Sequence, residues 1–390
     1  MTSSRTMKKP FDLSYAITLI AIFMTGIASA GLLLFKPLIV GALIDDYHFT
    51  PAQSGFVAGI EMAGIGLSSF IVAAFGGAWN RRRVILIGAT LGILGSLGPI
   101  LSDAYVPILL CRLMAGIGCG LIAAVVLAVI GTTRDADRTF GLYYMFSYAS
   151  AALLMPLAVW TMIRFHIVGG YLLITLLLCI VFVTAHRIPA TYIGLREDGS
   201  KHTLPPFPWA SGVLSLGLSL IFWIGFGGIW AFVERLGVSA GLEHADIGGV
   251  LSLSQVAAFG GALTASMLHL RFGRTPLLAA SIGFAILGVV MVGWASSISV
   301  FTIGVLIFGF IWPLFLAYLG GTMALLDPAG RIVAMSVASQ TVGMAVGPAL
   351  AGVLAGMFGY VAIAVMAMGC FALSLALVPP LMLKIRANDD

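Results

Sequence analysis

Charged residues are scarce in this chain. Only 9% of its 390 residues are Asp, Glu, Lys or Arg, whereas a soluble globular domain usually carries about 25%. So few charges cannot cover the surface of a folded particle of this size, and much of that surface must face lipid. The composition therefore excludes a soluble enzyme, a nucleic-acid-binding protein and a secreted domain. It indicates an integral membrane protein.

Several motifs that carry chemistry are also missing. The sequence contains no P-loop, no dinucleotide fingerprint between a strand and a helix, no Cys/His cluster with metal-ligand spacing and no H-E-x-x-H. We therefore expect no enzymatic activity, no cofactor and no metal site. The four cysteines all fall in apolar stretches, which argues against a disulfide framework: Cys111, Cys119, Cys179 and Cys370.

Long apolar runs are abundant instead. A helix needs roughly 20 mostly apolar residues to cross a bilayer, and helices satisfy their own backbone hydrogen bonds, as lipid requires. Breaks at charged residues, Pro and Gly separate twelve such runs, near 13–41, 52–76, 84–103, 105–131, 139–163, 168–188, 210–236, 246–269, 276–296, 299–325, 332–356 and 359–384. We predict an all-α integral membrane protein with 12 transmembrane helices.

The basic residues predict how the chain is oriented. If both termini are cytoplasmic, Arg164 is the basic residue of the outer loops and Arg235 lies at a helix end. The inner segments then hold 16 of the 20 Lys and Arg residues: Arg5, Lys8, Lys9, Arg81, Arg82, Arg83, Arg134, Arg138, Arg187, Arg196, Lys201, Arg271, Arg274, Arg331, Lys384 and Arg386. Cytoplasmic loops carry such an excess. We expect cytoplasmic termini in a bacterial inner membrane, and the net charge of +5 does not indicate a nucleic-acid partner.

The chain divides into two halves. The longest polar stretch, 189–209, contains four prolines and mixed charges, which is typical of a linker between domains. We predict a six-helix bundle at 1–188, a cytoplasmic linker at 189–209 and a second six-helix bundle at 210–390. Three pairs of residues repeat at an offset of 192 to 194 positions, which favours an internal repeat over chance: Asn80 and Gly273, Pro156 and Pro348, Glu61 and Gln255.

These features resemble the major facilitator superfamily over essentially the whole chain. The resemblance rests on two halves of six helices, a central linker, basic turns after the second and eighth helices, and the run from Arg112 to Gly118, which is similar to the family's R-x-x-x-G-x-G motif. It implies two pseudo-symmetric six-helix bundles. It also implies gating loops at Arg81, Arg82, Arg83, Arg271 and Arg274.

The sequence departs from the family pattern at two places. The acid that normally precedes the basic turn is replaced by Gly77 in the first half and by Leu270 in the second. A Gly343-x-x-x-Gly347-Pro348 run resembles the fifth-helix motif of antiporters in that family, but it lies in the eleventh predicted helix. This motif therefore does not assign the direction of transport.

Four charged side chains fall inside the predicted spans. Glu61 and Glu234 are the acids, and Lys36 and Arg112 are the bases. Intramembrane ionisable groups are costly and mark functional sites by default. At about 1.5 Å per residue, Lys36 lies roughly 13 Å below the outer surface, Glu61 about 15 Å and Arg112 roughly 10 Å. We predict that Lys36 and Glu61 face each other with Arg112 nearby, either as a coupling device or as a static ion-pair network.

Polar and aromatic residues mark the remaining candidates. Thr18, Thr25, Ser29 and Lys36 share one face of the first helix, which indicates a water-filled cavity. Aromatic and amide groups suit an organic ligand near the midplane between the halves, although each aromatic residue alone could serve packing or an interfacial belt. The candidates are Tyr144, Tyr148, Trp230, Gln255 and Gln340.

Taken together, the sequence predicts a monomeric secondary active transporter whose partners are a small molecule, protons and membrane lipid. Two intramembrane cations against one deep acid favour a small organic anion, with Lys36 and Arg112 pairing with its carboxylate. Glu61 is the expected proton-exchanging group, and Glu234 is a second candidate. The alternative is a proton-coupled multidrug efflux antiporter, in which Glu61 or Glu234 contacts a cationic substrate. A facilitator without coupling is less consistent with the buried charges.

Overall fold

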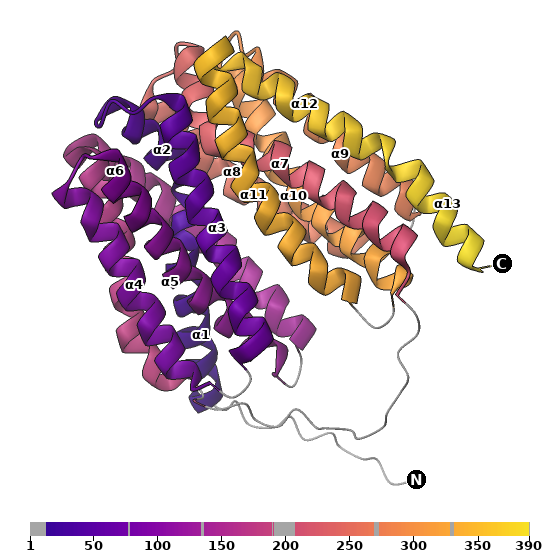
Figure 1. Ribbon diagram of the computed structural model, residues 1–390, viewed down its shortest axis with the longest axis horizontal. Coiled ribbons are helices and arrows are strands. Elements are labelled where there is room, and N and C mark those ends of the chain that lie inside the picture. The colour runs from indigo at the N-terminus through magenta and orange to yellow at the C-terminus, as the bar shows by residue number, and fades with distance from the viewer. Residues whose placement is uncertain are drawn as a thin grey trace, which may run out of the picture.

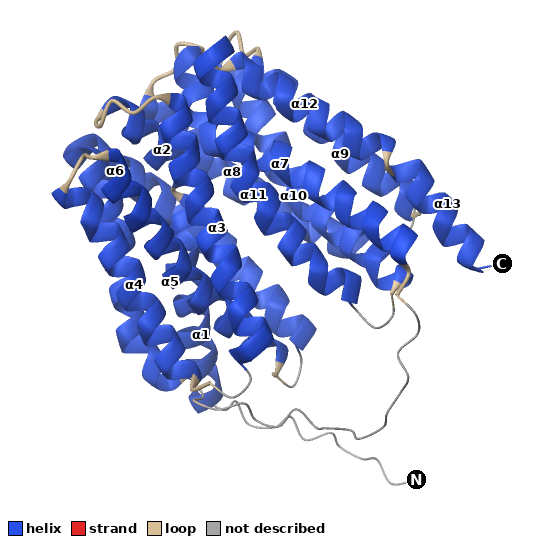
Figure 2. Cartoon of the chain, viewed as in Figure 1, coloured by secondary structure: helices blue, strands red, loops and turns tan. Residues whose placement is uncertain are grey.

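The computed structural model describes residues 13–76, 79–133, 136–188, 190, 207–268, 273–327 and 331–389. Within these ranges the chain is helical and contains no strand (Figures 1 and 2). The helices are α1 (Leu13–Leu34), α2 (Lys36–Asp45), α3 (Pro51–Phe75), α4 (Arg81–Leu101), α5 (Tyr105–Gly131), α6 (Ala136–Thr184), α7 (Trp209–Ser239), α8 (His244–Leu268), α9 (Arg274–Gly293), α10 (Ile298–Leu326), α11 (Arg331–Phe358), α12 (Val361–Ala376) and α13 (Val378–Asp389), with a short 3₁₀ turn at Ala185–Arg187. The predicted all-α fold is confirmed.

The helices form two bundles that lie side by side. Figure 1 shows α1 to α6 in indigo and magenta on one side and α7 to α13 in rose, orange and yellow on the other. We call them the N-terminal and C-terminal bundles. Among the described residues, eleven helices are long and apolar enough to cross a membrane. The long helix α6 counts once in that number although it contains a sharp reversal.

The reversal in α6 lies at Phe165 and His166. Neither residue has helical backbone angles, and His166 has φ +54°. Gly169 lies against the Thr161 carbonyl so closely that a Cβ would not fit, so the chain turns back on itself here. The 49 residues of α6 therefore make two crossings, which corresponds to the predicted runs 139–163 and 168–188 and brings the number of crossings to twelve.

Two predicted runs are divided where one helix was expected. The run 13–41 is broken at Phe35, whose φ of −87° and ψ of 2° end α1 before α2 begins. The run 359–384 is broken at Leu377, between α12 and α13. Apolar composition determined that these segments cross the membrane. Apolar composition alone did not indicate the two breaks, although prolines follow both of them: Pro37 after the first, and Pro379 and Pro380 after the second.

Glycine allows helices of the N-terminal bundle to pack backbone to backbone. A Cβ on Gly116 of α5 would meet the carbonyl oxygen of Glu61 in α3, and a Cβ on Gly64 of α3 would meet the carbonyl of Leu113 in α5. Small residues permit such close approach in membrane helices. The contact fixes the height of Glu61 against α5.

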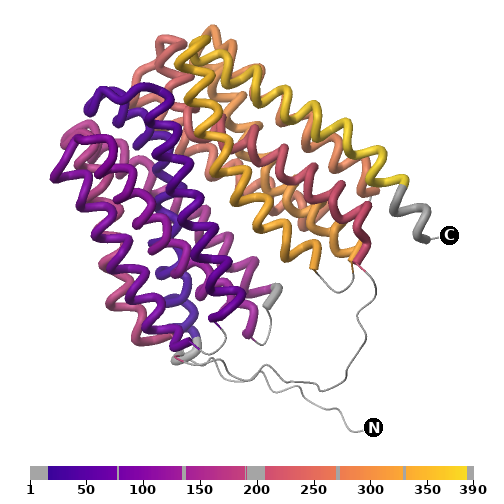
Figure 3. The backbone as a smooth tube through the Cα atoms, viewed as in Figure 1, coloured from indigo at the N-terminus to yellow at the C-terminus, as the bar shows by residue number. Residues whose placement is uncertain are grey.

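The bundles approach each other most closely at one end. The far face consists of segments 46–50, 102–104, 240–243, 294–297 and 359–360, together with the reversal of α6 at Phe165 and His166. The linker face is the opposite end, where residues 188 and 210 flank the predicted linker 189–209. Gly55 of α3 lies against the Pro348 carbonyl of α11, and Gly352 of α11 lies against the Pro51 carbonyl. In Figure 3 the two bundles diverge toward the end of the molecule where the linker lies.

Candidate functional site

Three charged side chains meet inside the N-terminal bundle. Nζ of Lys36 lies 3.4 Å from Oε1 of Glu61. Nε of Arg112 donates to Oε2 of Glu61 at 2.9 Å, and Nη2 contacts the same oxygen. The three residues are 3%, 4% and 1% exposed, so burial removes them almost completely from solvent and lipid. We call them the buried triad. The structure thus brings together the three deepest charges that the sequence singled out.

A helix break positions Lys36. Lys36 is the first residue of α2, directly after the break at Phe35, and Pro37 occupies the first turn. Proline is well suited to this position because its missing N–H would have no intrahelical partner there. The ammonium of Lys36 also donates to the carbonyl of Ala58 in α3 at 3.2 Å. The break therefore directs this side chain toward α3 and Glu61.

The predicted polar stripe of the first helix is only partly correct. Thr25 is fully buried, and its hydroxyl lies 2.7 Å from the hydroxyl of Thr184 in α6. Ser29 is also buried and donates to a backbone carbonyl of α1. These two residues therefore pack inside the bundle rather than facing a water-filled cavity. The break at Phe35 ends the regular rotation that had placed them on one face with Lys36.

An aromatic ring completes the surroundings of the triad. The guanidinium carbon of Arg112 lies 5.2 Å from the centre of the Tyr171 ring, within the range of a cation–π contact. Among the described atoms, Nη1 of Arg112, the Tyr171 hydroxyl and Oε1 of Glu61 have no hydrogen-bond partner. With Glu61 ionised, two cations and one anion give the triad a formal charge of +1.

The space beside the triad is small. The void lined by Lys36, Glu61 and Arg112 has a volume of about 10 Å³ for the centre of a water-sized sphere, which is about enough for one water molecule. The other lining residues come from the same bundle: Leu32, Ile39, Val40, Leu43, Val57 and Ala58. In this conformation the triad has room for a water molecule or a proton, but not for an organic solute.

A second group of charges joins the bundles at the far face. Arg235 of α7 donates to both carboxylate oxygens of Asp45 in α2, at 2.6 and 2.5 Å, and also to Glu234, at 2.6 and 2.9 Å. Nδ1 of His244 lies 2.7 Å from Oε1 of Glu234. Glu234 is 2% exposed, so its carboxylate is buried although it lies near the end of α7. We call these four residues the far-face cluster.

Two of the predicted aromatic residues lie where the bundles meet. Nε1 of Trp230 in α7 donates to the carbonyl of Leu33 in α1 at 3.0 Å. The ring of Tyr148 in α6 lies 5.9 Å from that of Trp312 in α10, at an interplanar angle of 70°. Both contacts cross from one bundle to the other, so Trp230 and Tyr148 lie at the interface between the bundles.

The other ligand candidates lie apart from the buried triad. Tyr144 is 41% exposed, and its ring centre lies 5.4 Å from that of Tyr143. Gln255 of α8 is partly exposed and donates to the hydroxyl of Ser254 at 3.3 Å. Gln340 of α11 is also partly exposed. The structure does not bring these residues into contact with the triad.

The basic turns of the predicted gating loops lie at the linker face. Arg81 is 3% exposed, and its backbone N–H donates to the carbonyl of Ala190 at 3.0 Å. Nε of Arg82 donates to the carbonyl of Ile188, also at 3.0 Å. Both arginines thus fasten the start of α4 to the chain that leads into the predicted linker.

The remaining basic residues of the gating loops are placed differently. The backbone N–H of Arg83 donates to the side chain of Asn80, which caps α4. Arg274 begins α9, and its guanidinium lies against Gly321 of α10. Arg271 and the two positions that replace the family's acid, Gly77 and Leu270, lie outside the described residues.

Sequence reasoning missed four participants. Tyr171 was not considered, and Asp45, Arg235 and His244 were treated as residues of loops or helix ends. The adjacent acid and base at Glu234 and Arg235 gave the only signal, because two opposite charges near a helix end are easier to bury as a pair. Asp45 in α2 lies 190 positions from Arg235 and could not be read from the sequence as its partner. His244 lies only 10 positions from Glu234, across the turn between α7 and α8.

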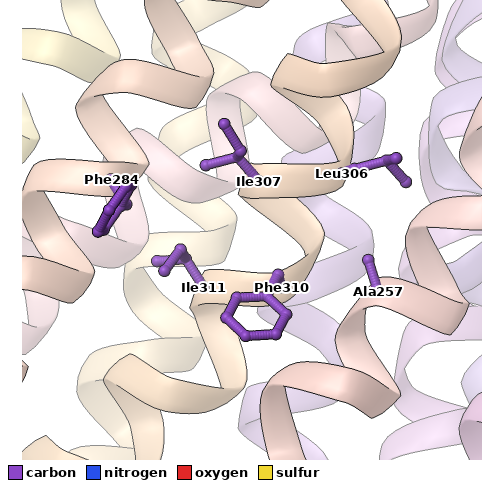
Figure 4. Close-up of a pocket in the computed structure, with 6 residues that line it drawn as sticks. All are labelled: Ala257, Phe284, Leu306, Ile307, Phe310 and Ile311. Atoms are coloured by element: carbon purple, nitrogen blue, oxygen red, sulfur yellow. The ribbon is translucent and has the colours of Figure 1, made fainter. Parts of the chain in front are cut away.

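A separate apolar groove lies between three helices of the C-terminal bundle. Its volume is about 330 Å³. Figure 4 shows its lining of apolar side chains from α8, α9 and α10: Ala257, Phe284, Leu306, Ile307, Phe310 and Ile311. No charged or polar side chain lines it. The groove therefore contains nothing that could orient a polar solute.

Several solved structures share this arrangement of helices. The solved structure of a mutant of the nucleoside transporter NupG is 10% identical, with a TM-score of 0.75 and coverage of 95% of this chain and 100% of that one. A bacterial homolog of the human lysosomal transporter Spinster, in an inward-facing and occupied conformation, is 15% identical, with a TM-score of 0.70 and coverage of 96% and 99%. The human organic anion transporter MFSD10 (TETRAN) is 14% identical, with a TM-score of 0.62 and coverage of 94% and 100%.

The family follows from the sequence match. The model of the Major Facilitator Superfamily matches residues 18–325, which is most of the chain, whereas no curated protein matches it. This chain therefore belongs to the major facilitator superfamily. It is an integral membrane transporter and not an enzyme, which confirms the resemblance that the helix count and the run at Arg112 had indicated.

Proposed function

We propose that this protein is a secondary active transporter that moves a small organic anion together with protons by alternating access. The observation that carries the proposal is the buried triad with its formal charge of +1. An excess positive charge enclosed in a membrane protein favours binding of an anionic solute. The same enclosure makes protonation of Glu61 depend on what else is bound.

The charge balance gives the coupling a physical basis. Without solute, adding a proton to Glu61 would leave Lys36 and Arg112 as two unneutralised cations, and a charge of +2 in a buried site is very unfavourable. A carboxylate bound near them would restore one negative charge. Protonation of Glu61 in its presence would bring the site back only to +1, so binding of the anion favours binding of the proton.

The small void beside the triad limits when the solute could bind. Room for about one water molecule means that a solute carboxylate would reach Lys36 or Arg112 only in a conformation that opens the site. In alternating access, two bundles rock around a site near the midplane. Tyr144, Tyr148 and Trp230, with Gln255 and Gln340, are our candidates for contacts with the body of the solute.

The alternative of a multidrug efflux antiporter is less well supported. In that reading Glu61 or Glu234 contacts a cationic substrate directly. Both carboxylates are already paired with an arginine, Glu61 with Arg112 and Glu234 with Arg235. A cation would have to displace a buried guanidinium, whereas an anion would meet two bases that share one acid.

We further propose that the linker face is cytoplasmic. The basic residues Arg81, Arg82, Arg83 and Arg274 belong to this end of the described chain, and positive charge is enriched on the cytoplasmic side. The contacts between the bundles at the far face would then close the outer side. The protein would sit in a bacterial inner membrane with both termini cytoplasmic, as a monomer surrounded by lipid.

Flux into liposomes tests the proposal. Purified protein would be reconstituted, and uptake of labelled mono- and dicarboxylates measured with and without a pH gradient. We expect gradient-driven accumulation of at least one carboxylate, its loss in Glu61→Gln, and at least tenfold weaker apparent affinity in Lys36→Ala and Arg112→Ala.

The exposed acid Glu243 provides a matched control, because Glu243→Gln makes the same chemical change outside both charged groups and should leave accumulation unchanged. Accumulation that survives in Glu61→Gln would contradict the coupling role. Normal anion affinity in both cation variants would contradict the anionic substrate. Proton-driven movement of organic cations alone would favour the antiporter.

A further inference from the structure

We propose that the far-face cluster is a lock between the two bundles and that His244 makes the strength of this lock depend on the pH of the water at that face. The inference rests on the proposed alternating access, because a lock has meaning only if the far face opens. It adds a proton-binding group that regulates the conformational change and is separate from Glu61.

The lock is a charged contact between the two bundles. Asp45 ends α2 of the N-terminal bundle, whereas Arg235 belongs to α7 of the C-terminal bundle. Two parallel N–H···O bonds join them, at 2.6 and 2.5 Å, and such bidentate pairs are the strong form of this interaction. Opening the far face must break both bonds.

A glycine in α2 allows the two bundles to come close enough for the contact between Asp45 and Arg235. Gly41 of α2 lies against the carboxylate of Glu234, and a Cβ at this position would overlap the Oε2 and Cδ atoms. Glu234 in turn holds Nε and Nη2 of Arg235. The absence of a side chain at Gly41 therefore lets α2 approach closely enough for Asp45 to reach the guanidinium.

His244 is placed to supply a missing charge. With a neutral imidazole, the cluster contains two carboxylates and one guanidinium, which gives −1. Nδ1 of His244 lies 2.7 Å from Glu234 and Nε2 lies 4.0 Å from Asp45. Protonation would bring the cluster to zero. The His244 side chain is 55% exposed, so it can exchange protons with the water at the far face while the bundles are together.

The two conformations differ in what a protonated His244 meets. In the closed state it faces one carboxylate from each bundle. In the open state Asp45 moves away, and Glu234 of its own bundle remains. The closed state therefore binds the proton more tightly, so acidification through the ordinary range of histidine, near pH 6.5, favours closure.

The other titratable groups near the cluster have partners of their own, stay neutral or are exposed. Asp46 pairs with His166 in α6 at 3.2 Å, and the hydroxyl of Tyr47 donates to the Pro99 carbonyl. Burial raises the pKa of Tyr360 above its usual value, so this phenol stays neutral throughout the range. The remaining groups at this end are exposed or lie in loops: His48, Asp103, Arg164, Glu243 and Asp246.

Distance measurements between spin labels would test the lock. Cysteines at Ala104 and Ser296, both exposed residues of far-face loops in opposite bundles, would be labelled in a background in which the native cysteines are replaced and flux is retained. From pH 8.0 to 5.5 we expect the ratio of closed to open far face to rise about tenfold, corresponding to one unit of difference in proton affinity between the states.

His244→Gln is the critical variant, because glutamine keeps a hydrogen-bond donor but cannot become charged. We expect it to abolish the pH response, whereas His166→Gln should retain it. Gly41→Ala should shift the protein toward the open far face at every pH.

A full pH response in His244→Gln, or no response in the unsubstituted protein, overturns the lock. If the labels show both an open and a closed distance, but the ratio of the two populations does not change with pH, the lock is overturned and alternating access stands. A single distance under all conditions together with absent flux would contradict both proposals.

Discussion

Arg112 donates two hydrogen-bonding groups, Nε and Nη2, to a single oxygen of Glu61, while Lys36 approaches the other oxygen at 3.4 Å. The carboxylate is thus shared between two cations on different helices. Removing the acid should therefore destabilise the protein more than removing one of the two bases.

Glu61→Gln should destabilise the protein far more than Lys36→Met. The glutamine leaves two buried cations without a counter-ion, and removing one partner of a buried ion pair typically costs about 3 to 5 kcal/mol. The methionine leaves Arg112 and Glu61 as a neutral pair. Thermal unfolding in detergent compares the variants, and an equal or larger loss in Lys36→Met would show that Lys36 is the essential structural partner.

Gly116→Ala should disturb the buried triad through the backbone. The added methyl would meet the carbonyl oxygen of Glu61, and overpacking of this kind typically costs about 1 to 3 kcal/mol. Thermal unfolding measures the effect. Gly131→Ala in the same helix is the control, since nothing lies within 4 Å of its position. Similar melting temperatures for the two variants would mean that α3 and α5 can move apart to accept the methyl without a loss of stability.

Gly55→Ala should push the bundles apart at the far face. Its methyl would meet the Pro348 carbonyl of α11, and this contact joins the two bundles near the far face. We expect a larger open population between labels at Ala104 and Ser296. Gly249→Ala in α8, which has no neighbour within 4 Å, should leave the distances as they are. An unchanged distribution in Gly55→Ala would show that helix tilting absorbs the methyl.

Asp327 should make stability depend on acid. Hydrogen bonds from the Arg331 side chain are the main cause that lowers the pKa of Asp327 to about 2, and the backbone N–H groups of Arg331 and Ile332 add to it. The carboxylate therefore stabilises the folded state above the ordinary pKa near 4, and this contribution disappears as the pH falls toward 2. Melting temperatures of wild type and Asp327→Asn should differ at pH 6 and converge near pH 2. A constant difference would assign the effect to another group.

The sequence predicted the fold and the triad because both depend on few signals. Apolar runs, basic turns and the repeat between Glu61 and Gln255 were enough for twelve crossings in two halves. Counting about 1.5 Å per residue placed Lys36, Glu61 and Arg112 at similar depths, and charges that are so rare inside lipid must find one another. These three residues could be predicted as partners because the predicted spans contain so few other charged residues.

Other features depended on information that composition does not carry. The break at Phe35 is a local change of backbone angle, and it interrupts the helical rotation that had placed Thr25 and Ser29 on one face with Lys36. The far-face cluster joins Asp45 to Arg235, which are 190 positions apart, and both looked like ordinary residues near water. Only packing of one bundle against the other reveals that they meet.

The location of the triad has a consequence for the order of events. Lys36, Glu61, Arg112 and Tyr171 all belong to helices of the N-terminal bundle, so a proton could bind to or leave Glu61 without any change in the distance between the bundles. In the proposed mechanism, protonation of Glu61 and rocking of the bundles would then be separate steps. The N-terminal bundle would carry the proton as one rigid body, and the contacts between the bundles would determine when that body moves.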